Sequence, residues 1–156
     1  MNIFALDYSP GVAARWHNNK HCSKMILETA QLMCSTLNLL GLETPYKTCH
    51  KNHPCRLWAG ENRNNFLWLG QLGIYLGEEF EYRYNKVHKS VEVIKFCIGK
   101  YRALPEGEMT KFALAMPDHY KVDCPIQSYR NYYIGAKQHL ADWGKREVPE
   151  WYVITV

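Results

Sequence analysis

The residues best suited to chemistry include a short polar run ahead of a proline. His50, Lys51, Asn52 and His53 place two imidazoles, an amine and an amide directly before Pro54. Proline has a fixed φ and no amide hydrogen, so it suits the first turn of a helix. The run is therefore expected on a loop leading into a helix N-terminus, where free amide groups favour an anion. This pattern predicts a phosphate-facing site. The alternative is a solvated loop whose histidines bond backbone carbonyls.

A second polar group of residues recurs at helical spacing. It consists of His17, His21, Lys24, Glu28 and Gln31, at steps of three and four that share one helix face. An amine beside proton-transfer groups can form a Schiff base with an opened sugar. We predict Lys24 as the amine, with Lys20 as a second candidate, and Glu28 and His21 as the catalytic groups beside it. The alternative is a solvated face with a weak Lys24–Glu28 ion pair.

Aromatic and cationic side chains alternate in two further segments, residues 82–89 and 129–137. Cations contact phosphates and aromatic rings stack on bases, so this mixture is typical of nucleic-acid contacts. Long side chains that cover a helix end would give the same pattern. Trp58 and Tyr84 are further candidates for stacking. The predicted substrate-binding residues are His50, Lys51, Asn52, His53, Tyr82, Arg83, Lys86, His88, Lys89, Tyr129, Arg130, Tyr133 and Lys137.

Histidine spacing also raises a metal site as an alternative. His17 and His21 stand four residues apart, and Cys49, His50 and His53 are further ligand types. No glutamate completes a zinc-protease motif, and tetrahedral zinc would need the loop and the helix to meet. We therefore expect no metal and no cofactor.

The overall composition is that of a soluble globular protein. The chain has 156 residues, 47% of them apolar and 22% charged, which is long enough for one domain with a sizeable core. The net charge of +4 is compatible with an anionic partner of small footprint. Six cysteines without a CxxC pair indicate free thiols in a reducing cytoplasm. Neither a signal peptide nor an apolar run of membrane-spanning length is recognisable, so no membrane partner is expected.

Hydrophobic periodicity predicts the elements that position these groups. Residues 2–6 are expected as a strand or extended segment, and 148–153 as an extended strap that packs back. Helices are expected over 11–40, from about 55 or 61 to 84, over 91–98, and from Pro125 with an inner face that reaches Trp143. Residues 105–123 form a loop-rich connection. The fold class is therefore mainly α: a compact single-domain helical bundle over residues 1–156, with short extended ends.

Several motifs resemble a family of small bacteriophage proteins along nearly the whole chain. They are His21-Cys-Ser-Lys-Met-Ile-Leu-Glu28, His50-Lys-Asn-His-Pro-Cys-Arg-Leu-Trp58, Phe112-Ala-Leu-Ala-Met-Pro117 and Tyr129-x3-Tyr133-x3-Lys137. More distantly, the order of elements is similar to that of the phage pyrimidine-dimer DNA glycosylase (endonuclease V) group. The resemblance implies an endonuclease V-like helical fold, a location in the cytoplasm of an infected host cell, and hydrolase chemistry on DNA.

The chain departs from that group at the nucleophile. Those glycosylases attack the sugar with an N-terminal amine exposed by methionine removal, and Asn2 is too bulky for efficient trimming. The first-helix acid of that group also stands in an Arg-Glu context, whereas this chain has Lys20-His-Cys-Ser-Lys24 there and its nearest acid, Glu28, lies more than a turn further on. Lys24 is for this reason the predicted amine.

Two functions of different class follow from the sequence. The first is a glycosylase/lyase-like activity on a damaged or modified base, with DNA or a phosphorylated nucleoside as partner. The second is a non-enzymatic protein that sequesters a nucleotide. Both predict that the His50–His53 loop, the His21/Lys24/Glu28 face and the Lys86–Lys89 segment converge on one cleft.

Overall fold

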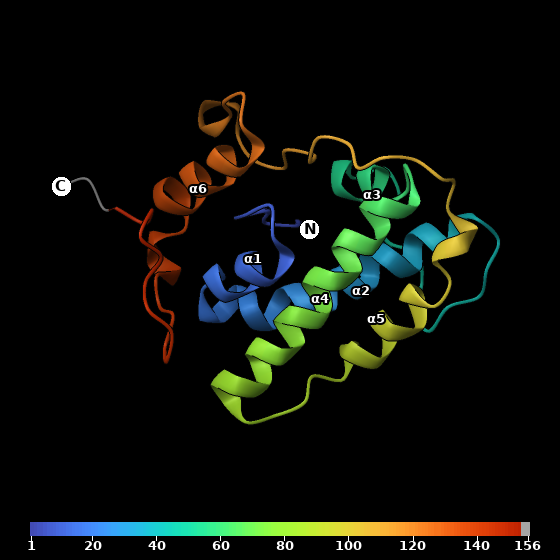
Figure 1. The fold of residues 1–156 in the computed structure, drawn as a ribbon, viewed down its shortest axis with the longest axis horizontal. Coiled ribbons are helices and arrows are strands. Elements are labelled where there is room, and N and C mark those ends of the chain that lie inside the picture. The colour runs from blue at the N-terminus through green and yellow to red at the C-terminus, as the bar shows by residue number, and fades with distance from the viewer. Residues whose placement is uncertain (154–156) are drawn as a thin grey trace.

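The computed structural model describes residues 1–153, and helices make up most of it (Figure 1). The helices are α1 Pro10–Trp16, α2 Asn19–Leu39, α3 Pro54–Ala59, α4 Arg63–Tyr84, α5 Ser90–Ile98 and α6 Pro125–Ala136. Three single 3-10 turns lie at Tyr101–Ala103, Asp118–Tyr120 and Gln138–Leu140. No strand occurs in this part of the chain, and residues 2–6 run as an irregular buried segment. The prediction of a mainly helical, compact fold is confirmed.

Helix α4 is the central element, since it packs against α1, α2, α3 and α5. Its buried stripe contains Phe66, Leu69, Leu72 and Leu76. Three buried glycines on α4 let the neighbouring helices approach, because a Cβ at any of them would meet side chains of α5. Figure 1 shows α4 crossing in front of α2, with α5 alongside. The central position expected for this helix is therefore found.

Close packing at Gly73 gives a first testable prediction. A Cβ there would lie 2.7 Å from Ile94 Cδ1 and 2.8 Å from Thr29 Cγ2. Overpacking costs about 1–3 kcal/mol and exceeds the helix-propensity gain. We expect Gly73→Ala to lower the free energy of unfolding by about 1–2 kcal/mol in urea denaturation. The control is Gly11→Ala in α1, where the nearest atom is an ordinary 3.6 Å contact and stability should not fall. Equal stability of the two variants would contradict this packing.

The helix predicted over 11–40 is interrupted, which corrects the sequence interpretation, and of the two starts predicted for the next helix, 55 and 61, the structure agrees with the later one. The expected helix over 11–40 is two helices, because the backbone is extended at His17 and Asn18. The Asn18 side chain accepts a hydrogen bond from His21 N at 2.8 Å and so begins α2 anew. In the same way, Asn62 caps α4 after α3 has ended at Ala59. Apolar periodicity continues across both breaks and therefore does not reveal them.

The C-terminal helix is shorter than predicted. Helix α6 begins at Pro125, as expected, but it ends at Ala136 rather than continuing to Trp143. Trp143 is nevertheless buried, and its indole N–H donates to Trp16 O at 2.8 Å. The segment after α6 thus packs back on α1, and Figure 1 shows it running beside that helix. The strap was predicted over 148–153, where Trp151 and Tyr152 do pack against the core, although a turn interrupts the extended backbone at 150–151. Leu140 and Trp143, which extended the predicted helix, lie in the segment before it.

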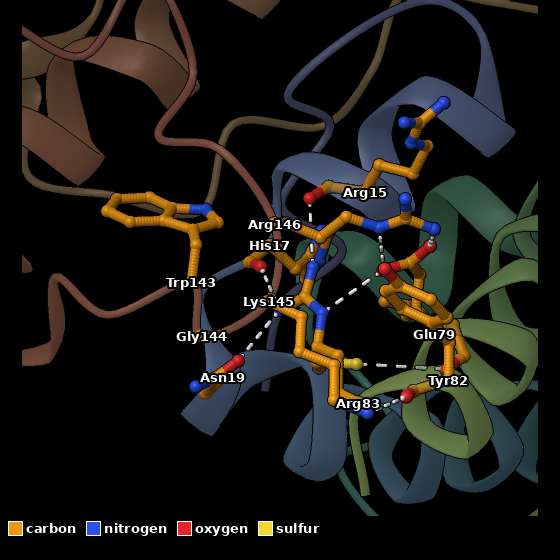
Figure 2. A network of polar contacts seen from close by, with 12 residues as sticks. Arg15, His17, Asn19, Glu79, Tyr82, Arg83, Trp143, Gly144, Lys145 and Arg146 are labelled. Carbon is orange, nitrogen blue, oxygen red and sulfur yellow. Dashed lines mark hydrogen bonds and ion pairs between the residues drawn. The ribbon is translucent and has the colours of Figure 1, made fainter. Parts of the chain in front are cut away.

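A buried ionic network joins α4 to α1, α2 and the tail (Figure 2). Arg83 Nε pairs with Glu79 Oε2 at 3.1 Å, and Arg146 pairs with Glu79 Oε1 at 2.7 Å. The remaining Arg83 nitrogens donate to backbone oxygens of Arg15 and His17 and to the Asn19 side chain. Burial alone would raise the pKa of Glu79, but the Arg146 hydrogen bonds and both arginine charges lower it overall. The carboxylate therefore stays ionised and joins α4 to the tail, while Arg83 joins α4 to α1 and α2.

Candidate active site

The candidate site is centred on the Glu28 carboxylate of α2, which is only 6% exposed. Its Oε1 lies 3.1 Å from the Met1 ammonium nitrogen, and that group is also buried. Its Oε2 has no hydrogen-bond partner and lies 4.0 Å from Lys24 Nζ, an exposed amine. A buried oxygen without a partner is costly and needs an explanation, such as a role in binding or catalysis. Two amines therefore flank one partly unsatisfied carboxylate.

A strained turn brings the N-terminus to Glu28. Asn2 Oδ1 accepts hydrogen bonds from Ile3 N at 2.7 Å and Phe4 N at 3.0 Å. Asn2 Nδ2 donates to Ala115 O at 2.8 Å, which anchors the turn to the loop before α6. Phe4 has φ 37°, a value rare for a bulky side chain, and such strain clusters at functional sites. The turn places the Met1 amine against α2.

His21 lies beside this turn and is held inside the protein. Its ring stacks on Phe4 with centroids 4.2 Å apart, and its Nδ1 is 2.7 Å from the Tyr133 hydroxyl. Burial, together with the charges of His17, Lys137 and Lys24, lowers the pKa of His21 to about 2. A neutral imidazole that is bonded to a tyrosine orients its neighbours rather than supplying a proton near pH 7. His21 thus fits a positioning role.

His17 is not on the predicted shared face, because it ends α1 rather than belonging to α2. Its ring is fully buried, Nδ1 is 2.7 Å from Ala13 O, and Nε2 has no partner. Burial lowers the pKa of His17 to about 4.

These two histidines predict a loss of stability in acid. Their unfolded pKa is about 6.5, so below that pH the unfolded chain binds protons first. The free energy of unfolding should therefore fall as the pH drops from 6.5 towards 4, approaching about 1.4 kcal/mol per pH unit for each histidine. His17→Leu should make the slope between pH 6 and 5 shallower by about one proton, as measured by urea denaturation. His119→Leu, at an exposed position, is the control. An unchanged slope in His17→Leu would contradict burial of a neutral imidazole.

The histidine loop ahead of α3 meets the site. His53 caps α3, accepting from Cys55 N at 3.0 Å, and Pro54 begins the helix as predicted. Burial lowers the pKa of His53, as do the charges of the N-terminal amine and His50, while a hydrogen bond to the backbone of Met1 raises it. His50 adopts φ 49°, and its ring lies 6.2 Å from that of His53. The loop thus places the His53 imidazole near the Met1–Glu28 pair, whereas His50, Lys51 and Asn52 are exposed.

Three of the predicted binding residues are buried and form contacts within the protein. Arg83 is 7% exposed and belongs to the buried network of Figure 2. Tyr129 and Tyr133 are fully buried, with hydroxyls bonded to Ala113 O and to His21. Trp58 is 2% exposed, so stacking on a base fits none of these three rings. Buried rings and ligand-facing rings have the same spacing in sequence, which is why these rings were predicted to bind a ligand although they are buried.

Other predicted residues lie at the edges of the helical core. Arg130 donates to Leu6 O at 3.0 Å, and its guanidinium lies over Trp16 and Trp151. Lys137 lies over Tyr132, and its charge also acts on His21, so it is close to the site. Tyr82 is exposed and is covered in part by Lys145 and Arg146.

The Lys86–Lys89 segment lies on another side of α2. The His88 ring packs on Phe80, and Lys86 lines a cavity with Lys20 and Ser23. Ser23 and Glu28 are separated by about 140° around the helix. Two of the three predicted clusters therefore meet, and the third forms a separate surface.

The sequence interpretation missed the Met1 amine. Met1 was set aside because of Asn2, yet the amine of an untrimmed methionine itself reaches Glu28.

Comparisons with known proteins and structures find no relative of this chain. No protein-family model matches the chain, and searches of curated proteins and of solved structures find no match. Among residues 1–153, no three histidine, cysteine or acidic side chains are grouped as metal ligands. Across the same residues, no helix is long and apolar enough to cross a bilayer. The fold and site thus define a helical domain with a buried amine–carboxylate pair.

Proposed function

We propose that this chain processes nucleic acid or nucleotides by amine chemistry, as a DNA glycosylase/lyase-like enzyme of phage origin. Its substrate is a damaged or modified base in DNA. The observation that carries the proposal is the buried Glu28 carboxylate, 3.1 Å from the Met1 amine and with its second oxygen unbonded. The helical architecture is compatible with an endonuclease V-like arrangement, and a phage-infected cytoplasm is the corresponding setting.

The Met1 amine is the better nucleophile of the two. It lies closer to Glu28 than Lys24 does, and it is buried whereas Lys24 is 61% exposed. Lys24 then serves as a cation for a substrate phosphate at the rim of the site.

The chemistry assigns each group one task. The amine gives a proton to Glu28, and its nitrogen forms a bond to the sugar C1′ as the glycosidic bond breaks. The base leaves with the electron pair of that bond and takes the proton that Glu28 received from the amine. The sugar ring opens as its oxygen takes a proton from the attached nitrogen, which leaves an imine between protein and sugar. The Glu28 carboxylate, ionised again, then accepts a proton from C2′, and the 3′ phosphate is expelled. His53 lies near the amine and is positioned to orient the substrate.

An activity screen on oligonucleotides tests the proposal. Duplexes that carry an abasic site, a pyrimidine dimer or a modified base would be incubated with the protein and examined for base release and strand cleavage. We expect cleavage of at least one, beginning with the abasic duplex, since it needs only the lyase step. If no duplex were cleaved and a nucleotide still raised the melting temperature, the sequestering function would be favoured instead.

A further inference from the structure

A cavity of about 330 Å³ lies between the start of α2 and the end of α4. Its volume falls within the range of about 300–1,000 Å³ that is typical of small-molecule sites. It is lined by Asn19, Lys20, Ser23, Phe80, Tyr84 and Lys86. Lysines are the only charged groups among them, so the lining favours an anion.

Two aromatic rings form one wall of this cavity. Phe80 and Tyr84 are one helical turn apart on α4, with ring centroids separated by 5.2 Å. The Tyr84 hydroxyl donates to Asn19 O at 3.3 Å, and the His88 ring abuts Phe80 at 5.1 Å. These contacts hold the rings in place, yet Tyr84 remains 40% exposed. Fixed aromatic surface that is open to solvent suits stacking on a planar group.

The two lysines are positioned from different elements. Lys20 is exposed in the first turn of α2, where the helix dipole also favours negative charge. Asn85 ends α4 in a left-handed conformation at φ 56°, and this turns the chain so that Lys86 lines the cavity. His88 then holds the loop, because its ring packs on Phe80 and its Nδ1 accepts a hydrogen bond from Ser90 N at 3.1 Å. Both lysines line the same cavity, and their amines can pair with a phosphate group.

We propose that this cavity binds a nucleobase together with its phosphate. The base stacks on the Phe80–Tyr84 wall, and Lys20 and Lys86 pair with the phosphate. The ligand is either a free mononucleotide or one nucleotide of a single strand, which present the same chemistry. The cavity lies about 140° around α2 from Glu28, so this inference does not depend on the proposed catalytic function.

Calorimetric titrations with adenosine 5′-monophosphate, adenosine and a short single-stranded oligonucleotide test this inference. We expect saturable binding of the monophosphate, at least tenfold weaker binding of adenosine, and affinity that decreases with salt. Tyr84→Ala and Lys86→Gln should each weaken binding about tenfold. Tyr75→Ala on the same helix and Lys95→Gln, both at exposed positions, are matched controls that should bind as the wild type does.

The outcomes separate this proposal from the other. Tighter binding of the oligonucleotide than of the monophosphate would identify a strand, and the reverse would identify a free nucleotide. Glu28→Gln should retain binding here whether or not the protein cleaves DNA. The proposal is overturned if neither phosphate-bearing probe binds, or if Lys86→Gln, a surface change that leaves the core intact, binds as tightly as wild type.

Discussion

Replacement of Glu28 by glutamine should slow strand cleavage by about 10²–10⁴-fold, the range over which general acid–base catalysis contributes. Glutamine keeps the shape of the side chain but cannot accept the proton of the Met1 amine, whose nitrogen lies 3.1 Å from the carboxylate. Binding of the oligonucleotide should change little, because phosphate contacts come from cations outside the pair. Single-turnover cleavage rates and a binding titration of the same duplex measure the two effects separately.

Glu81→Gln is the matched control, since it makes the same chemical change at an exposed position of α4. Its cleavage rate should equal that of the wild type. The melting temperature of Glu28→Gln must be measured as well, because the change leaves a buried ammonium without its partner. A folded Glu28→Gln protein that cleaves within twofold of the wild-type rate would exclude Glu28 as the proton-transfer group.

Replacement of Arg83 by methionine should lower the free energy of unfolding by about 3–5 kcal/mol, since removal of one partner leaves a buried charge uncompensated. The Arg83 side chain is 2% exposed and bonds Glu79, Asn19 and two backbone oxygens. Glu79 would keep only Arg146, and the carbonyls of Arg15 and His17 would lose their donor. Urea denaturation followed by circular dichroism measures the loss.

The control for this change is Arg102→Met, at an exposed arginine whose guanidinium lies over the Tyr101 ring. Its effect should stay within about 0.5 kcal/mol, as is usual for surface substitutions. A loss of less than about 1 kcal/mol in Arg83→Met would show that the network of Figure 2 contributes little to stability.

The sequence predicted the helices well where caps and periodicity agree. Pro54 and Pro125 mark helix starts, and the apolar spacing of α4 identifies the central helix. It failed where a side-chain cap begins a new helix inside a continuous apolar pattern. Asn18 and Asn62 are such caps, and neither differs in type from asparagines that lie on helix surfaces.

The candidate site was predicted in part. The spacing of Lys24 and Glu28 placed them together, and the Pro54 signal brought His53 to a helix start. Contacts between distant segments depend on tertiary packing, so the Met1–Glu28 pair was beyond reach. The buried roles of Arg83 and Tyr133 could not be predicted either. The sequence does not distinguish an arginine or tyrosine that contacts a ligand from one that is buried in the protein core.

Borohydride trapping tests the central claim, that an amine beside Glu28 forms a covalent bond with a sugar. The protein would be incubated with an abasic duplex and sodium borohydride, and the adduct digested and located by mass spectrometry. We predict a stable protein–DNA adduct on the Met1 α-amine, reduced by at least tenfold in Glu28→Gln and retained in Glu81→Gln. The absence of any adduct, or an adduct on a lysine remote from Glu28 such as Lys121, would contradict the claim.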